Sequence, residues 1–297
     1  MAAKERRELK EKTESLIHLW KIRSAFLAFS RGGQVRLCGK SMIKVLSIAG
    51  SDPSSGAGIQ ADLKTFQALG AFGMAVPAAL TIQNSRGVSG VEPVSSGTLS
   101  RQLDELLSDI RPDAVKTGML LTRKNVDAVA KAVAVFKVRK LVIDPVLRSS
   151  SGRPLLQAAA VASLKKNLFP HALLVTPNLP EAEVLSGMSI SSDTDMDYAA
   201  GKILEMGPSY VLIKGGHRAS GTASDTLYGG DTVFSFSTPR RNGEFHGTGC
   251  VLSSAITVFI GRGLPVEKAV EKAKQFVDRL LRSAKPVGKG RTKYFQF

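Results

Sequence analysis

The segment His246-Gly247-Thr248-Gly249-Cys250 combines residue types that can bind an anion and accept a proton. The apolar run over residues 251–258 predicts a helix beginning here, so free backbone N–H groups and the positive end of the helix dipole meet at this loop. Its glycines let the backbone approach a ligand, and Thr248 adds a hydroxyl. In the first helical turn, the dipole is expected to lower the pKa of the Cys250 thiol. The segment predicts a phosphate site beside a proton acceptor, although a Gly-x-Gly turn alone more often precedes a core helix.

Two further stretches carry groups that suit a nucleotide. Asn178-Leu179-Pro180-Glu181 places an amide and a carboxylate one helical turn apart, a spacing that suits water bound to Mg²⁺. The alternative is an ordinary helix start in which Glu181 stabilises the dipole. Lys214-Gly215-Gly216-His217 is not a Walker loop, because GxxxxGK[ST] is absent from the chain, and no GxGxxG fingerprint follows the first strand. Any bound ATP must therefore be held by another kind of loop.

The elements that would position these groups alternate as in a parallel sheet covered by helices on both faces. Strands are expected over residues 44–49, 75–82, 114–117, 140–144, 172–176 and 210–214, followed by a hairpin within 226–236. Helices are expected over residues 58–69, 97–108, 124–137, 157–168, 180–185, 196–206 and 266–283, besides the one after Gly247. In such α/β sheets ligands bind outside the carboxyl ends of the strands, which is where the polar motifs fall.

Length and composition indicate one large domain. The 297 residues, 43% of them hydrophobic, can bury a large core, and no linker or repeat divides them. The net charge of +16 attracts polyanions, but no zinc-finger spacing or RNP-like motif is present, so no nucleic-acid partner is expected. Cys38 and Cys250 are too few for a disulfide framework. Because no membrane-spanning run or signal peptide is evident, we expect a soluble, cytoplasmic protein that does not bind membranes.

Residues 1–41 differ from the rest of the chain in composition and rhythm. They contain ten Lys and Arg residues against four Glu, a net charge of +6. Organellar targeting by this segment is left open, although the four glutamates count against a transit peptide. Met42 immediately precedes the first expected strand. We therefore expect residues 1–41 to be a dispensable basic extension and residues 42–297 to form the functional domain.

Several motifs, taken in order, resemble the hydroxymethylpyrimidine and phosphomethylpyrimidine kinases of thiamine biosynthesis, which belong to the ribokinase-like superfamily. The motifs are AGSDPSSGAGIQADLKT at 49–65, QNSRGV at 83–88, KTGML at 116–120, DPV at 144–146, TPNLPEA at 176–182, KGGH at 214–217 and HGTGC at 246–250. The resemblance covers nearly everything beyond Met42. It implies a ribokinase-like α/β fold with a mostly parallel sheet, and phosphoryl transfer from ATP with Mg²⁺.

The same resemblance implies roles for individual residues. The pyrimidine site would contain Gln83, Asp62 and Met119, with Gly50 and Val146 lining the pocket. The magnesium and phosphate set would be Asn178, Glu181 and Lys214, with Asn178 and Glu181 acting through water, and Thr248 in the phosphate loop. Cys250 stands where the superfamily often has Asp, so we interpret it as the base for the alcohol proton; the alternative is that it only packs. Ser55 stands where the family usually has Gly, and Arg148-Ser149-Ser150 where family sequences vary.

The expected reaction phosphorylates 4-amino-5-hydroxymethyl-2-methylpyrimidine and then its monophosphate to the diphosphate. One alternative is a pyridoxine or pyridoxal kinase; another, from a different class, is a basic nucleic-acid-binding protein on a degenerate kinase fold. Gln83 favours the pyrimidine, because its amide offers a donor and an acceptor to the ring nitrogen and the exocyclic amine. Relatives that favour pyridoxal tend to carry Met at this position. A homodimer is left open.

Overall fold

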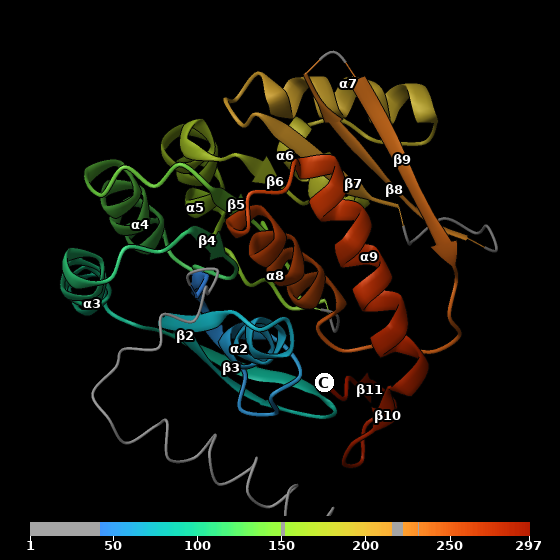
Figure 1. Cartoon of the computed structure of the whole chain (residues 1–297), viewed down its shortest axis with the longest axis horizontal. Helices are drawn as coiled ribbons and strands as arrows, with labels where there is room; N and C mark the ends of the chain where they lie inside the picture. Colours follow the sequence, from blue (N-terminus) through green and yellow to red (C-terminus); the bar gives the residue numbers. More distant parts are fainter. Residues whose placement is uncertain (1–41, 150–151, 216–221, 231) are drawn as a thin grey trace, which may run out of the picture. The chain divides into compact units, whose positions relative to one another are not determined.

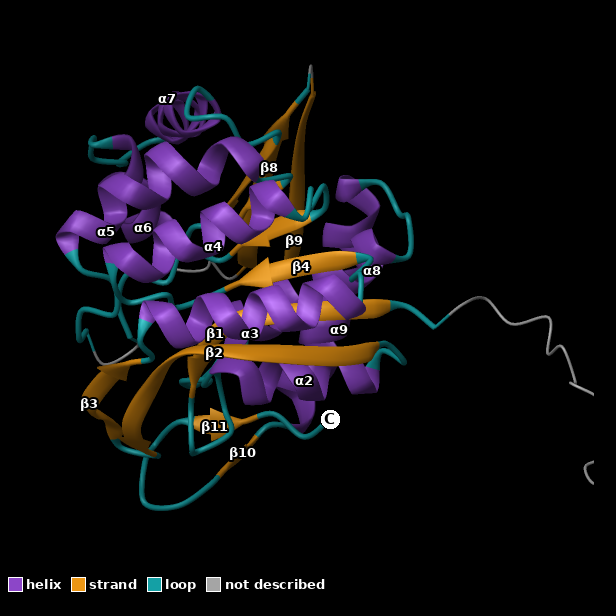
Figure 2. Cartoon of the chain, turned by 90° about the vertical axis from the view of Figure 1, so that its left-hand side faces the viewer, coloured by secondary structure: helices purple, strands orange, loops and turns teal. Residues whose placement is uncertain are grey.

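The computed structural model describes residues 42–149, 152–215, 222–230 and 232–297, and these residues form one nine-stranded sheet with helices on both faces (Figure 1, Figure 2). The strand order is β3-β2-β1-β4-β5-β6-β7-β8-β9. Neighbours from β2 to β7 pair in parallel, whereas β3, β8 and β9 pair antiparallel. The prediction of an α/β fold with a mostly parallel sheet is confirmed.

The strands and helices agree closely with the expected pattern. The strands are β1 (Lys44–Ser51), β2 (Phe72–Asn84), β3 (Gly87–Pro93), β4 (Ala114–Thr117), β5 (Leu141–Ile143), β6 (Leu174–Val175), β7 (Tyr210–Lys214), β8 (Thr222–Gly229), β9 (Thr232–Pro239), β10 (Lys285–Pro286) and β11 (Lys293–Tyr294). The helices are α2 (Gly58–Ala68), α3 (Ser96–Asp109), α4 (Arg123–Val135), α5 (Ala158–Ser163), α6 (Leu179–Ser186), α7 (Asp193–Leu204), α8 (Thr248–Gly261) and α9 (Val266–Ser283), with the short helices η1 (Leu164–Leu168) and η2 (Phe169–His171) after α5.

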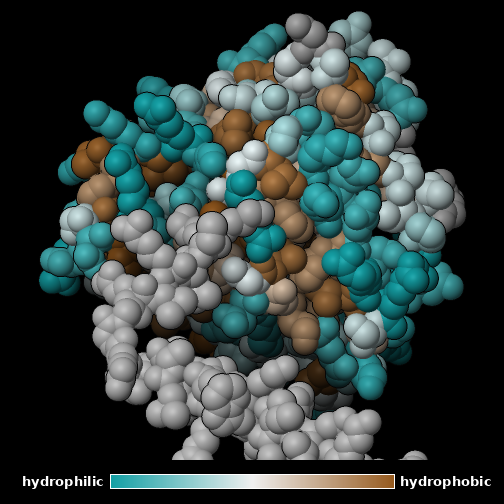
Figure 3. Space-filling view, in the orientation of Figure 1, coloured by the Kyte–Doolittle hydropathy of each residue, from teal (hydrophilic) through white to brown (hydrophobic). Residues whose placement is uncertain are grey.

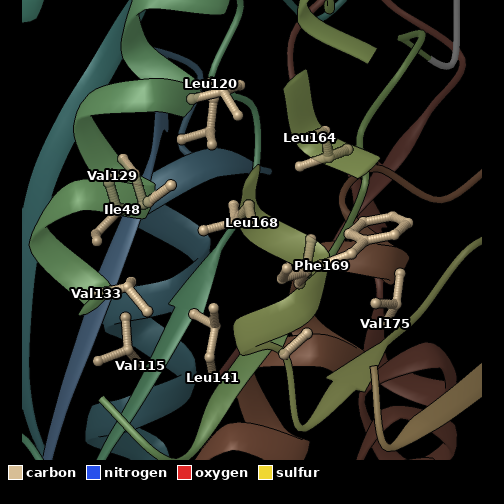
Figure 4. Packing of buried hydrophobic residues seen from close by; sticks show 14 of the residues in the cluster. Ile48, Val115, Leu120, Val129, Val133, Leu141, Leu164, Leu168, Phe169 and Val175 are labelled. Atoms are coloured by element: carbon tan, nitrogen blue, oxygen red, sulfur yellow. The ribbon is translucent and has the colours of Figure 1, made fainter. Parts of the chain in front are cut away.

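The central strands are apolar on both faces because each face is covered by a helical layer. Successive side chains of a strand point to opposite faces, so Leu141 and Ile143 of β5 join the core beneath α4, whereas Val142 joins the core beneath α8 and α9. In Figure 4, Val133 of α4 lies beside Val115 of β4. One layer contains α3 to α7, and the other contains α2, α8 and α9.

Two features depart from the predicted pattern. The edge strand β3 pairs antiparallel with β2, although its sequence contains two Gly residues and ends in Pro, residue types that weaken a strand signal. The pair β10–β11 lies near the C-terminus, and its two-residue strands are too short to show a period. These differences leave the predicted carboxyl ends of the central strands in place.

Helix α8 begins differently from helix α6. Helix α6 begins with a capping box between Asn178 and Glu181, in which each side chain accepts a hydrogen bond from the other residue's backbone N–H. Helix α8 has Gly247 as its N-cap, at φ +78, where no side chain can cap the first turn. A side chain at Gly247 would also overlap the carbonyl of Gly56. The first turn of α8 is therefore left without a side-chain cap, an arrangement that an anion site would need.

The exposed side chains give the surface a mixed character. On the face drawn in Figure 3, hydrophilic residues cover much of the surface, with hydrophobic residues scattered among them. In the described segments, the helices are all too short or too polar to cross a membrane.

Candidate active site

A cavity of about 500 Å³ lies where the carboxyl ends of the central strands meet the first turn of α8. Its lining includes four of the five predicted substrate residues together with part of the predicted anion loop, namely Gly50, Gln83, Met119, Val146, Gly247 and Cys250. Gly50 and Gln83 lie near the ends of β1 and β2, Met119 and Val146 lie in the connections after β4 and β5, and the other two lie at the start of α8. The sheet topology therefore brings distant motifs to one place, as the carboxyl-end rule predicts.

Asp62, the fifth predicted substrate residue, lies outside this cavity. It is completely buried on α2, and its carboxylate accepts hydrogen bonds from Lys116 Nζ at 2.8 and 2.9 Å, Ser47 Oγ at 2.6 Å and Ser254 Oγ at 2.7 Å. Lys116 lines the cavity, so Asp62 acts on the site through this lysine. Burial alone would lower the pKa of Lys116, but Asp62, together with Cys250 and Asp144, outweighs it and holds the pKa well above its usual value.

Cys250 faces the cavity from the first turn of α8 but is a weak acid. Burial raises the pKa of its thiol, Lys116 and the Gly58 backbone N–H lower it in part, and the carboxylates of Asp62 and Asp144 add to the rise. The resulting pKa is about 11. The predicted lowering of this pKa is therefore wrong, because the loss of water and two nearby negative charges outweigh the helix dipole.

Lys214 and Asp144 form an ion pair against the start of α8. Lys214 Nζ lies 3.0 Å from Asp144 Oδ1, and Ser253 Oγ donates to Asp144 Oδ2 at 3.3 Å. A Cβ atom at Gly249 would lie 3.3 Å from Lys214 Nζ, so the missing side chain lets the helix approach this pair. Although burial raises the pKa of Asp144, Lys214 and Lys116 together hold it below its usual value.

Asp144 was not among the predicted site residues, although the sequence carried a signal for it. It follows directly after β5, at the edge of the sheet where ligands bind.

Thr248, which follows the N-cap Gly247, opens the helical turn that contains Gly249. The predicted phosphate residues Lys214, Thr248 and Gly249 are thus brought together.

Asn178 and Glu181 lie beside Lys214 at the start of α6. Asn178 Oδ1 accepts from the Glu181 N–H at 2.9 Å, and Glu181 Oε2 accepts from the Asn178 N–H at 2.9 Å, so the alternative role as a helix start is realised. The Lys214 N–H donates to the Pro177 carbonyl at 2.8 Å, which joins the two segments. Burial raises the pKa of Glu181 to about 7; Lys214 partly offsets this rise and Asp144 adds to it. The buried carboxyl groups of Glu181 and Asp144 therefore both interact electrostatically with Lys214.

The raised pKa of Glu181 has a consequence for stability. Its carboxyl binds a proton more tightly in the folded state than at its ordinary pKa of 4.5, so its contribution to the free energy of unfolding falls as pH rises from about 4.5 to about 7. The loss is up to about 3 kcal/mol. We expect Glu181→Gln to remove this part of the pH dependence, measured by urea unfolding between pH 4.5 and 8. Glu205→Gln, at an exposed position, is the matched control; equal pH slopes in wild type and Glu181→Gln would contradict the expectation.

The loop after β1 joins the cavity to His246. His246 Nε2 lies 2.8 Å from Asp52 Oδ2 and 2.9 Å from Gln83 Nε2. His217, the last residue of the KGGH motif, lies outside the described residues. Ser55, where the family usually has Gly, adopts φ +66, a left-handed conformation that favours glycine.

Comparison with known proteins agrees with the motifs. Residues 52–294 match the phosphomethylpyrimidine kinase family. Over 261 residues, the chain is 41% identical to the hydroxymethylpyrimidine/phosphomethylpyrimidine kinase of Bacillus subtilis. This alignment covers 86% of this chain and 96% of that protein. It is 44% identical over 247 residues, 83% of this chain, to the thiamine biosynthesis bifunctional protein of Geobacter sulfurreducens, but spans only 50% of that longer protein.

Solved structures give the same fold. The pyridoxal kinase of Staphylococcus aureus in complex with AMP-PCP and pyridoxal aligns with a TM-score of 0.79 at 34% identity, covering 86% of this chain and 93% of that chain. The 34% identity to this pyridoxal kinase is lower than the 41% identity to the hydroxymethylpyrimidine/phosphomethylpyrimidine kinase of Bacillus subtilis. This difference favours a pyrimidine kinase over a pyridoxal kinase. The predicted resemblance is thereby confirmed, and the chain belongs to the phosphomethylpyrimidine kinase family.

Proposed function

We propose that this chain transfers the γ-phosphoryl group of ATP to the hydroxymethyl group of 4-amino-5-hydroxymethyl-2-methylpyrimidine, and then to the resulting monophosphate. The chain is a phosphotransferase of thiamine biosynthesis. The observation that carries the proposal is the juxtaposition of Gln83 and Cys250 on one cavity, whose α8 end adjoins the Lys214–Asp144 pair. An alcohol held by Gln83 would thus face the groups that surround the phosphates.

Phosphoryl transfer of this kind depends mainly on positioning and on stabilising negative charge. The N–H groups of the first turn of α8, at Gly247, Thr248 and Gly249, would donate to the transferred group. Lys214, already held beside this turn by Asp144, would offset the charge of the triphosphate. The backbone and the lysine are fixed before the substrate arrives, so little reorganisation is needed at the moment of reaction.

The residues around Lys214 fit a magnesium ion bound through water. The carboxyl groups of Asp144 and Glu181 and the amide of Asn178 all lie around this one lysine. Carboxylate and amide oxygens are the ligand types that magnesium prefers, and it commonly keeps several of its waters. Asn178 and Glu181 would hold the ion, which would supply further neutralisation of the phosphate charge.

Cys250 would accept the proton of the attacking hydroxymethyl group. Because the pKa of its thiol is about 11, the thiolate that can accept this proton is a minor species at neutral pH. Lys116 and the Gly58 N–H are the two groups that favour the thiolate. The rate should then rise with pH as the thiolate fraction increases.

Gln83 would set the preference for pyrimidine over pyridoxal. Sites that hydrogen-bond a substrate reject analogues without matching groups, because buried polar atoms are left unpaired. We expect Gln83→Met to lower kcat/KM for the hydroxymethylpyrimidine by at least ~10-fold, about the value of one hydrogen bond, while pyridoxal is affected less or improved. The assay measures ADP release with each alcohol.

Gln67→Met, at an exposed position on α2, is the matched control for this substitution. An equal change in kcat/KM for both alcohols would remove Gln83 from substrate selection. If no alcohol stimulates ADP release while duplex DNA is bound at physiological salt, the kinase proposal fails in favour of a nucleic-acid-binding protein.

A chain that begins at Met42 should retain the activity. The site residues and the described hydrophobic clusters all belong to residues 42–297. We expect this shorter chain to give soluble protein whose kcat/KM lies within about 2-fold of the full chain, since it keeps the residues that form the described cavity. A large loss of soluble, active protein would show that residues 1–41 are required. Light scattering on the same samples tests for a homodimer.

A further inference from the structure

Asp52 organises the loop that follows β1. Its side chain is almost completely buried, and Oδ1 accepts from the Ser54 N–H at 2.8 Å and the Ser54 hydroxyl at 2.7 Å. Oδ2 accepts from the N–H groups of Gly56 at 3.2 Å and Ala57 at 2.9 Å. Burial would raise the pKa of Asp52, but hydrogen bonds from His246 and Ser54 outweigh it and lower the pKa. Asp52 is therefore an ionised carboxylate surrounded by donors.

This carboxylate determines which nitrogen of His246 carries a hydrogen. A carboxylate can only accept hydrogen bonds, so His246 Nε2, 2.8 Å from Asp52 Oδ2, must be the donor. Tyr294 packs edge-on against the imidazole with ring centroids 5.2 Å apart, and its hydroxyl donates to Ser54 Oγ at 3.2 Å. The imidazole is thus held in one position, with its Nε2–H on the side where Asp52 Oδ2 and the Gln83 amide both lie.

The side-chain amide of Gln83 meets the same nitrogen. Gln83 Nε2 lies 2.9 Å from His246 Nε2. An Nε2 that already carries a hydrogen cannot accept one from the Gln83 NH₂ group. Rotation of the amide by half a turn exchanges its nitrogen and oxygen without changing its shape. Oε1 then lies against the histidine, where it and Asp52 Oδ2 can share the single Nε2–H in a three-centre hydrogen bond.

We propose that Asp52 and His246 are a positioning pair that turns the Gln83 amide so that Oε1 faces His246 and the NH₂ group faces the cavity. In this orientation the NH₂ group can donate to a ring nitrogen, and the second lone pair of Oε1 can accept from an exocyclic amine. These are the two groups on one edge of an aminopyrimidine. The inference rests on the proposed recognition of the pyrimidine by Gln83 and adds the residues that select its orientation.

A double-mutant cycle tests the pair. His246→Phe keeps an aromatic ring beside Tyr294 but removes both nitrogens. We expect it to lower kcat/KM for the hydroxymethylpyrimidine by about 10-fold, mainly through KM, with KM for ATP unchanged. In the Gln83→Met background, where no amide remains to be turned, we expect His246→Phe to lower kcat/KM by less than about 3-fold. His171→Phe, at an exposed position on η2, is the matched control and should match wild type.

Nitrogen-15 NMR of the wild-type protein provides a readout that does not depend on activity. It should report His246 with hydrogen on Nε2, with the signal assigned by its absence in His246→Phe. A His246 that carries its only hydrogen on Nδ1, or equal effects of His246→Phe in the wild-type and Gln83→Met backgrounds, would overturn the proposal. If Gln83→Met alone changes both alcohols equally, the proposed substrate recognition fails instead, and the NMR result still decides the tautomer.

Discussion

Cys250→Ala should lower turnover of the hydroxymethylpyrimidine by about 10²-fold or more, the scale of a lost general base, while the Kd values for ATP and for the pyrimidine stay within a few-fold. The substitution removes the sulfur atom but leaves the backbone of the first turn of α8, which would hold the phosphates. We therefore expect turnover to fall while the binding of both ligands stays nearly unchanged. Single-turnover kinetics and equilibrium binding of each ligand measure the two effects, and near-normal turnover in Cys250→Ala would leave this residue with a packing role only.

The pH dependence makes the same test more specific. With a thiol pKa of about 11, the thiolate fraction increases about tenfold for each pH unit between 7 and 10. We therefore expect the wild-type kcat to rise over this range and the residual kcat of Cys250→Ala to stay flat. Cys250→Asp should recover part of the rate, with a flatter profile, because a carboxylate is ionised throughout.

The rate of alkylation of the Cys250 thiol should follow the same thiolate fraction. Reaction of Cys250 with iodoacetamide should be slow at pH 7, accelerate with pH, and be slowed by bound ATP, since the thiol adjoins the proposed phosphate loop. Cys38 is the chain's other cysteine, so peptide mass spectrometry must assign the modified site. A rapid, pH-independent reaction at Cys250 would contradict the raised pKa.

The fold could be predicted largely because its signals are local. Apolar runs of strand length alternate with helical periods, and the parallel strands from β2 to β7 all end at one edge of the sheet. The motifs at the ends of β1, β4 and β5 therefore had to meet. The edge strand β3 was missed because Gly, Ser and Pro interrupt its period. Edge strands tolerate such residues, since one side of their backbone makes no ladder.

The electrostatics of the site could not be predicted in the same way, because they depend on contacts across the fold. The thiol of Cys250 sits at a helix N-terminus, a local feature that predicts a low pKa. Its actual value follows from burial and from Asp62, which lies 188 positions earlier in the sequence. The partner of Asp62 is Lys116, on a strand 54 residues further along the chain. The sequence motifs identified Asp62 as important but not which atoms it contacts.

Lys116→Met should lower the free energy of unfolding by about 3–5 kcal/mol, because it leaves the Asp62 carboxylate buried without its countercharge. Both side chains are completely buried, with 0% of each exposed. Exposed ion pairs contribute about 0–1 kcal/mol, so Lys268→Met, which breaks the exposed Lys268–Glu271 pair, is the matched control. Urea unfolding at neutral pH compares the two variants, and equal losses would show that burial gives the Lys116–Asp62 pair no special weight.

The double variant Lys116→Met/Asp62→Asn separates this structural effect from catalysis. It removes both charges, and the amide oxygen of Asn can still accept from the hydroxyl groups of Ser47 and Ser254. We therefore expect the double variant to recover most of the lost free energy of unfolding, to within about 1–2 kcal/mol of wild type. Its kcat should stay below that of wild type, because Lys116, which favours the Cys250 thiolate, has a larger effect on the thiol than Asp62, which opposes it. If Asp62 instead bound the pyrimidine directly, adding Asp62→Asn to Lys116→Met would raise KM for that substrate further.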